Sequence, residues 1–214
     1  QMLEQLVAFV LTCLVVVVVP GPDFALVLRN APRGPRAATT AAAGIMVGNT
    51  ILAALAVLGV TALLGASEVV GTGIRIAGAA YLLYLGLRAF AEAFARKPKP
   101  SQPPALATGR QPGRASPFVQ GMVSNLLNPK VAVFYLSLFP QFNVAPFPPL
   151  AQHALMAGIF LLIASAWYVL LLSALKKVTG VLARPRTSRI VVGSSGAVLV
   201  GVGGTILTQT LASA

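Results

Sequence analysis

The chain has 214 residues, of which 57% are hydrophobic and only 9% are charged. Soluble domains carry about 25% charged residues, so this composition excludes a soluble fold and predicts a polytopic membrane protein. The net charge of +12 does not indicate a nucleic-acid partner, because the basic residues lie in short tracts between apolar runs and form no stripe among aromatics.

Six apolar segments are long enough to cross a bilayer, taking about 20 residues as one crossing. They cover residues 3–28, 37–66, 71–94, 118–142, 150–175 and 190–211. The proline-rich, basic segment 96–116 cannot bury enough apolar surface to fold alone. We therefore expect a three-helix transmembrane half over 1–95, a cytoplasmic linker over 96–116 and a second three-helix half over 117–214.

The first span is interrupted by Pro20, Gly21 and Pro22, and Asp23 follows directly. Two prolines remove backbone donors, so a helix cannot continue through this stretch intact. Inside a bilayer, opened backbone groups are tolerated only where they are buried in protein or face water. The break therefore predicts a polar site at membrane depth. We interpret the run as a transmembrane helix and not as a signal peptide, since no basic region precedes it.

The next two spans add small and polar residues. In the second span, residues 41–44 and Gly48 are small and let another helix approach closely. Asn49 lies in the middle of this uncharged span and needs a polar partner, either another helix or a ligand. In the third span, Tyr81 is a candidate ligand, although a tyrosine at such a position is more often a packing residue.

The fourth span contains a second break, formed by Asn125, Asn128, Pro129 and Lys130. Its order of proline, charge and apolar run repeats that of the first break. Because each half has an odd number of spans, the two halves would enter the membrane in opposite directions, as in many secondary transporters. A proline near a helix start is also favourable without any symmetry, and this simpler explanation stays open.

The basic residues orient the chain. Three lie between the first and second spans, five between the third and fourth, and five between the fifth and sixth. Basic loops stay in the cytoplasm, so both termini are expected on the outer side of a bacterial inner membrane.

Each charged or amide candidate has two interpretations. Asp23 is either a carboxylate that faces a cavity and takes part in proton coupling, or an acid that caps the second half-helix. Lys130 either holds a substrate carboxylate or pairs with Asp23, or it extends to the cytoplasmic surface. Asn125 and Asn128 offer amides to a substrate and also suit a role in capping the helix at Pro129.

Other residues argue against an enzyme. His153 is the only histidine, and its place beside an external loop predicts a surface residue. One histidine among few acids provides neither a metal-ligand set nor a catalytic triad. Cys13 is the only cysteine, so it forms no disulfide within the chain, and we interpret it as a small hydrophobic residue. No nucleotide-binding GxxxxGK[ST] motif is present, and no cofactor is expected.

Several motifs together resemble the LysE/RhtB family of amino-acid exporters. They are Pro20-Gly21-Pro22 with an arginine-bearing turn, the second-span glycines, and the stretches at 78–86, 125–130 and 139–142. The resemblance implies export of amino acids or close derivatives, driven by an ion gradient, with protons as the expected ion. Two positions depart from the family. Its members usually have asparagine where this chain has Asp23, and often an acid where it has Asn49, so acid and amide are exchanged.

We therefore predict an all-α carrier with six transmembrane helices in two inverted repeats, the first and fourth helices broken, working by proton antiport and alternating access. The predicted substrate and ion site comprises Pro20, Gly21, Pro22, Asp23, Asn49, Tyr81, Asn125, Asn128, Pro129 and Lys130. The predicted partners are an amino acid and the lipid bilayer. The glycines of the last span suit a homodimer contact and packing within the monomer equally well. An ion channel or small-ion permease on the same fold is the alternative.

Overall fold

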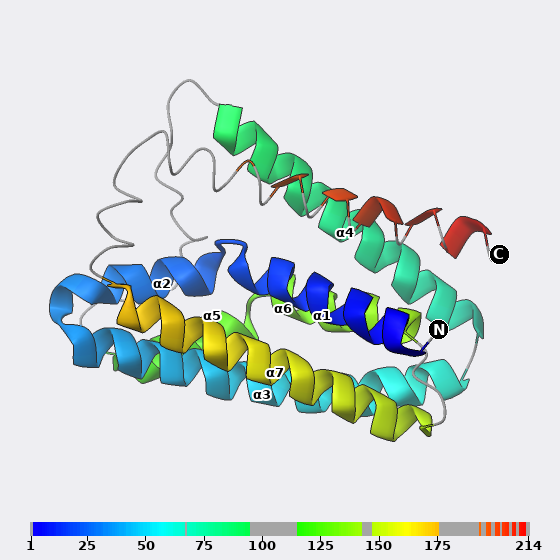
Figure 1. The fold of residues 1–214 in the computed structure, drawn as a ribbon, viewed down its shortest axis with the longest axis horizontal. Helices are drawn as coiled ribbons and strands as arrows, with labels where there is room; N and C mark the ends of the chain where they lie inside the picture. The colour runs from blue at the N-terminus through cyan, green and yellow to red at the C-terminus, as the bar shows by residue number, and fades with distance from the viewer. Residues whose placement is uncertain are drawn as a thin grey trace.

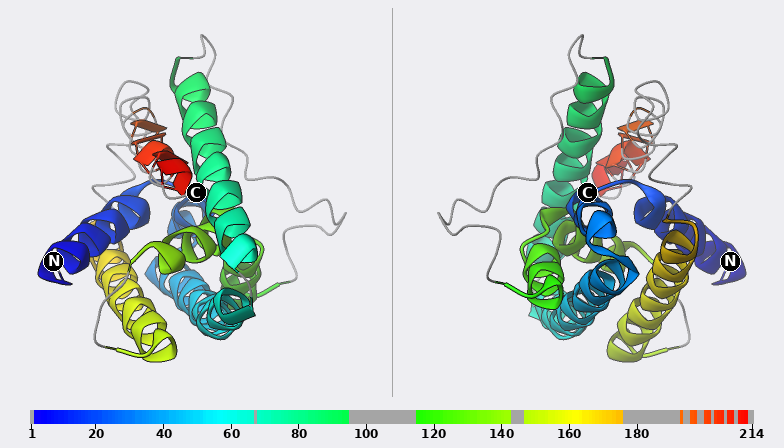
Figure 2. Two further views of the ribbon diagram at one scale, coloured as in Figure 1. Left: turned by 90° about the vertical axis from the view of Figure 1, so that its right-hand side faces the viewer. Right: turned by 90° about the vertical axis from the view of Figure 1, so that its left-hand side faces the viewer.

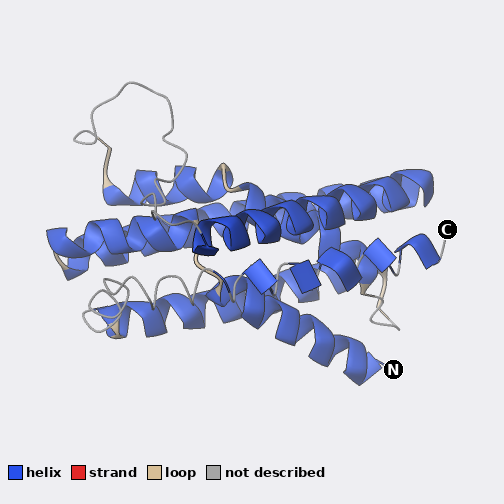
Figure 3. Cartoon of the chain, turned by 90° about the horizontal axis from the view of Figure 1, so that it is seen from above, coloured by secondary structure: helices blue, strands red, loops and turns tan. Residues whose placement is uncertain are grey.

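The computed structural model describes residues 2–66, 68–94, 115–142 and 147–175, together with separate positions between 193 and 212. Within this described part the chain forms helices and loops and no strand (Figure 3). The predicted linker over 96–116 falls almost entirely outside the described residues, and so does much of the span predicted over 190–211.

Seven α-helices and two short 3-10 helices have defined bounds in the described part. They are α1 (Met2–Val18), α2 (Pro22–Asn30), η1 (Ala31–Arg33), α3 (Pro35–Ala66), α4 (Glu68–Phe94), α5 (Pro117–Leu126), α6 (Pro129–Leu138), η2 (Phe139–Gln141) and α7 (Pro149–Ser173). Among the described residues, three helices are long and apolar enough to cross a membrane, or up to five spans if each bent pair counts as one. The chain is a helical integral membrane protein, and its six-span inverted repeat stays a prediction.

Both predicted breaks are present. The axes of α1 and α2 meet at 46°, and those of α5 and α6 meet at 44°. Pro22 and Pro129 occupy the first positions of α2 and α6. At a first helical position the missing N–H is not needed and the fixed φ suits the helix. Pro22 and Pro129 are therefore compatible with the start of the second half-helix at each break, although they could not lie in the interior of a continuous helix.

α3 packs against α2, α4, α5, α6 and α7, which are more partners than any other described helix has. Figure 1 shows it alongside α7. Its approach to α5 depends on glycine. A Cβ at Gly44 would overlap the carbonyl oxygen of Phe118, and a Cβ at Gly121 would overlap that of Ala41. A Cβ at Gly48 would lie 2.8 Å from the α5 backbone. The close helix approach predicted for the second span is confirmed, and α5 is the partner.

α4 packs against α6 and α3, and the described C-terminal residues lie beside it (Figures 1 and 2). A Cβ at Gly203 would lie 2.9 Å from the carbonyl oxygen of Ala79, and one at Gly86 would lie 2.8 Å from that of Gly196. At least part of the glycine-rich face is therefore used for packing within the monomer.

Candidate functional site

Polar side chains from the two breaks meet around Asp23. The Asp23 carboxylate accepts hydrogen bonds from Ser124 Oγ, Asn125 Nδ2 and Asn128 Nδ2, each at 2.8 Å. Asp23 lies in the first turn of α2 and is only 6% exposed, while its donors come from the end of α5 and the start of α6. The residue before α2 is Gly21, and no side-chain bond caps this helix. Asp23 therefore binds across to the other break and does not cap α2.

Asn128 has two roles at once. Its Oδ1 accepts a hydrogen bond of 3.0 Å from the Lys130 backbone N–H, which caps α6, while its Nδ2 donates to Asp23. The capping role expected of Asn128 is confirmed. Asn125 is buried and its Oδ1 has no hydrogen-bond partner within the described part of the chain. That oxygen is a free acceptor beside the carboxylate.

The Lys130 side chain binds to the backbone of the first break. Its ammonium donates a hydrogen bond of 2.7 Å to the carbonyl oxygen of Val19. Since α1 ends at Val18, this carbonyl lies in the broken backbone and needs a donor. In the described structure Lys130 neither forms an ion pair with Asp23 nor extends to the cytoplasmic surface, so both of those predictions are wrong for this conformation.

Polar groups of each break are therefore hydrogen-bonded to side chains of the other break. A side chain of the second break supplies the donor for Val19, and the carboxylate of the first break binds three donors of the second. Groups more than 100 residues apart in sequence thus form one connected polar cluster in the middle of the bundle.

Asn49 also finds its predicted polar partner on another helix. The Tyr135 hydroxyl donates a hydrogen bond of 2.9 Å to Asn49 Oδ1, which joins α6 to α3. Both residues are buried. Tyr135 was not among the predicted site residues.

A cavity of about 50 Å³ lies at this cluster. Its polar lining comprises Asp23, Asn49, Asn125, Asn128 and Lys130. Its other lining residues are Val16, Val17, Val19, Gly21, Phe24, Ile45, Val131, Phe160, Ala164, Trp167 and Tyr168. One carboxylate and one ammonium thus face a small space whose remaining walls are mainly apolar. The volume corresponds to fewer than two water molecules in the liquid, so any amino acid needs a wider site.

Six of the ten predicted residues line the cavity, because Gly21 joins the five polar ones. Pro20, Pro22 and Pro129 form the backbone breaks beside it. Tyr81 does not belong to the cavity lining; its ring packs against Tyr84 with centroids 6.0 Å apart. The packing interpretation of Tyr81 is the one that the structure favours.

A comparison with protein families identifies the chain. The family described as LysE type translocator matches residues 14–210. The chain belongs to this family. The predicted family is confirmed, and the chain is a membrane transporter and not an enzyme.

Two relatives of this translocator match over almost its whole length, and a third matches over part of it. It is 29% identical over 204 residues to the uncharacterized membrane protein YrhP of Bacillus subtilis, covering 94% of this chain and 97% of the relative. It is 31% identical over 206 residues to the uncharacterized membrane protein PA4757 of Pseudomonas aeruginosa, covering 95% and 94%. A leucine efflux protein of Salmonella typhimurium is 34% identical over 128 residues, which cover 59% of this chain and 58% of that protein. No solved structure matches the chain significantly.

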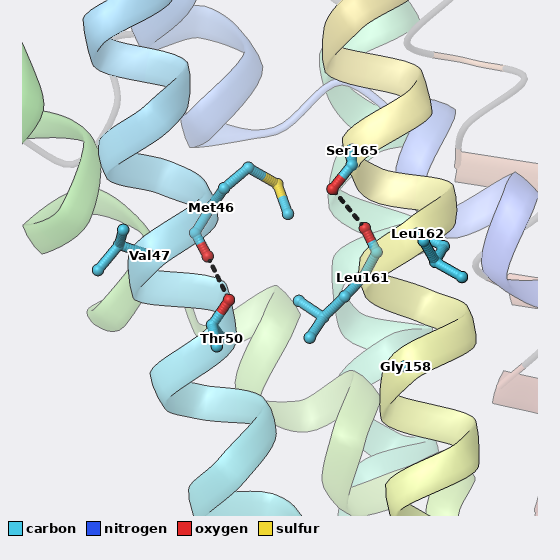
Figure 4. Close-up of a pocket in the computed structure, with 7 residues that line it drawn as sticks. All are labelled: Met46, Val47, Thr50, Gly158, Leu161, Leu162 and Ser165. Atoms are coloured by element: carbon cyan, nitrogen blue, oxygen red, sulfur yellow. Dashed lines mark hydrogen bonds between the residues drawn. The ribbon is translucent and has the colours of Figure 1, made fainter.

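The translocator also has a larger hollow of about 480 Å³ between α3 and α7. The residues that line it are Met46, Val47, Thr50, Gly158, Leu161, Leu162 and Ser165 (Figure 4). Its two hydroxyls donate to carbonyl oxygens of their own helices, Thr50 to Met46 at 2.9 Å and Ser165 to Leu161 at 2.7 Å (Figure 4). With no charge and no unbonded hydroxyl, this hollow is a poorer candidate for a zwitterion than the smaller cavity.

Several residues of the translocator's site were not predicted. Ser124 directly precedes Asn125, and this pair of polar residues inside a span was a signal that could have identified it. Phe160, Trp167 and Tyr168 lie on α7, which is apolar on all sides, so no periodicity marks the face that points to the cavity.

The prediction for His153 was wrong. Its side chain is only 2% exposed, a hydrogen bond of 2.8 Å joins its Nδ1 to Thr61 Oγ1, and its ring stacks on Phe139 with centroids 5.4 Å apart. The first turns of α7 are covered by the end of α3 and by η2, which the sequence alone did not bring together. Cys13 is fully buried, as expected of a small hydrophobic residue.

Proposed function

We propose that this translocator exports neutral amino acids with apolar side chains from the cytoplasm, by alternating access across a bacterial inner membrane. The observation that carries the proposal is the charge pattern of the small cavity: one carboxylate and one ammonium in an otherwise mainly apolar lining. The ammonium group of a zwitterion complements Asp23, and its carboxylate complements Lys130. The substrate side chain then contacts apolar walls, as in most small-molecule sites.

The substrate class follows from the same balance. A dibasic amino acid would bring two positive charges to a cavity with one carboxylate and one lysine ammonium, so one of its charges would stay buried without a partner. The leucine efflux proteins among the relatives support an amino acid with an apolar side chain.

The proposal extends to energy coupling. Asp23 is the acid in the cavity, and a carboxylate in this position can exchange a proton for the substrate ammonium. A proton that enters as the amino acid leaves would make the transporter an antiporter, with no cofactor. The two breaks meeting at one polar cluster support a site between two inverted halves, the arrangement typical of secondary transporters.

The cavity of about 50 Å³ is too small to hold an amino acid in this conformation. A space smaller than the substrate means that the surrounding helices must separate before an amino acid enters. α1, α2 and α7 contribute most of the apolar walls, and α7 packs against α3, so a movement of α7 away from α3 would widen the site.

Counterflow in liposomes that contain the purified protein tests the proposal. Vesicles loaded with unlabelled leucine should accumulate external labelled leucine, and vesicles loaded with lysine should not accumulate labelled lysine. Absence of exchange with every apolar amino acid would remove the proposed function. Electrical conductance far above carrier turnover, without counterflow, would instead indicate a channel.

The role of Asp23 is tested by substitution. In Asp23→Asn, export driven by a proton gradient should be lost, because the amide has no proton to exchange. Glu4→Gln is the matched control, since Glu4 is an exposed acid at the start of α1, away from the cavity lining. Unchanged gradient-driven export by Asp23→Asn would show that another group couples transport to protons.

A further inference from the structure

A cluster of buried aromatic rings lies against one side of the cavity. We call it the outer aromatic cluster: Phe134, Tyr135, Phe139, His153 and Phe160. All five side chains are buried, and neighbouring ring centroids lie 4.3 to 5.5 Å apart. Phe160 also lines the cavity, so the cluster begins at the cavity wall. It continues to His153 near the start of α7, roughly 10 Å further along that helix.

Two hydrogen bonds hold this cluster to α3. Tyr135 on α6 donates to Asn49, and His153 on α7 is bonded to Thr61. Their attachment points are about 18 Å apart along α3, because each residue of an α-helix advances about 1.5 Å. The bonds therefore secure both the cavity end and the far end of the cluster.

The turn that follows α6 is held as well. Arg75 of α4 donates a hydrogen bond of 2.7 Å to the carbonyl oxygen of Pro140 in η2. Gln152 of α7 donates one of 2.7 Å to the carbonyl oxygen of Phe142. Three other helices, α3, α4 and α7, thus each contribute a side chain that fixes the end of α6 and its turn.

A different buried cluster lies on the opposite side of the cavity, where Ile45 belongs to both the cluster and the cavity lining. The buried members of the cluster there are aliphatic: Leu26, Val27, Ala38, Ala42, Ile45 and Leu171. The partly buried Phe24, Tyr168, Leu172 and Leu175 pack against them. Near it, Arg29 donates to Gln120 across 3.3 Å on the exposed surface. This side carries the basic turn between the first two spans, which the charge pattern predicts to be cytoplasmic.

We propose that the outer aromatic cluster is the outer gate of the transporter and that the Tyr135–Asn49 and His153–Thr61 hydrogen bonds are its latches. This inference rests on the proposed export function. In the described conformation the gate is shut, and the amino acid leaves only after α6 and α7 separate from α3, which breaks both latches. Tyr135 and Thr61 are then positioning residues that set the fraction of time during which the site is open to the outside.

Alkylation of a cysteine in the cavity tests the gate. Ala164→Cys provides the reporter in a Cys13→Ala background, and Val131→Cys provides a second reporter, since both positions line the cavity. A membrane-impermeant maleimide is applied to spheroplasts, which expose the outer face, and to inverted vesicles, which expose the cytoplasmic face. We expect faster labelling in inverted vesicles.

Tyr135→Phe and Thr61→Val remove the latches and keep the side-chain shapes. Each should raise the rate of labelling from the outside roughly two- to tenfold, the change expected for one neutral hydrogen bond. Thr50→Val is the matched control, because Thr50 is also on α3 and its hydroxyl donates only to its own helix at Met46. Labelling from outside should not change in this control.

Equal labelling of the latch variants and the control from outside, in protein that still catalyses leucine counterflow, would overturn the gate. So would faster labelling from outside than from the cytoplasmic face in the reporter protein that keeps both latches. Absence of leucine counterflow in the wild-type protein would contradict the proposed export function and not the gate. The gate is tested separately, because labelling rates are measured without counterflow.

Discussion

Asn128 links the two breaks through a single side chain, and its two contacts can be separated. In Asn128→Ser the hydroxyl caps α6 about as well as an amide but is too short to reach the Asp23 carboxylate. We expect Asn128→Ser to keep the cap, to be less stable by about 1.5 to 3 kcal/mol because a buried hydrogen bond to a carboxylate is lost, and to lose most leucine counterflow. Asn128→Ala loses the cap too and should be less stable by about a further 1 kcal/mol. Full counterflow by Asn128→Ser would show that the contact with Asp23 is not required.

The sequence predicts the polar half of the site because charged and amide residues inside apolar spans are costly and few. Asp23, Asn125, Asn128 and Lys130 are recognisable for this reason, although their bonding is not: the sequence favours no donor for the Val19 carbonyl. The apolar half of the site is not predictable in this way. Lipid-facing and protein-facing residues in a span are equally apolar, so nothing in the sequence distinguishes Phe160 from its exposed neighbour Leu162.

The contact between α3 and α5 depends on three glycines, and the substitution of one tests it. Gly44→Ala places a methyl group against the α5 backbone, which must move away or strain at a cost of about 1 to 3 kcal/mol. Because α5 carries two of the donors to Asp23, counterflow should fall as well. Gly59→Ala on the same helix meets open space and should be neutral or slightly stabilising. Thermal unfolding of the two variants in detergent measures the difference; equal melting temperatures would contradict the close contact.

The helices themselves were largely predictable. Proline at the start of α2 and α6 fixes both breaks, and the predicted second span over 37–66 differs from α3 by two residues at one end. Gly34 explains this boundary, since its φ of 111° lies in the left-handed region and turns the chain into α3. The partner of the small-residue face was not predictable, because the sequence shows that a face permits close approach without showing which helix uses it.

The number of spans decides where the two ends of the whole molecule lie. Six crossings place both termini on the same side, and five place them on opposite sides. The charge pattern predicts both outside, so a C-terminal alkaline phosphatase fusion should be active and a C-terminal green fluorescent protein fusion should be dark. Added protease should cleave the basic linker over 96–116 only in inverted vesicles. If the C-terminal green fluorescent protein fusion is fluorescent while the N-terminus is external, the two ends lie on opposite sides and the number of spans is odd.

The hydrogen bonds between the two breaks also limit how tightly the transporter can bind its amino acid. A zwitterion that reaches Asp23 and Lys130 replaces amide donors and the Val19 carbonyl, so each polar contact that it gains is offset by one that the protein gives up. The net binding then comes mainly from burial of the apolar side chain, about 1.5 to 3 kcal/mol for a residue such as leucine. Because 1 mM affinity corresponds to about 4 kcal/mol, the site would bind its substrate only in the millimolar range or more weakly. Such a transporter stays idle at ordinary concentrations of the amino acid and works when the cytoplasmic pool overflows.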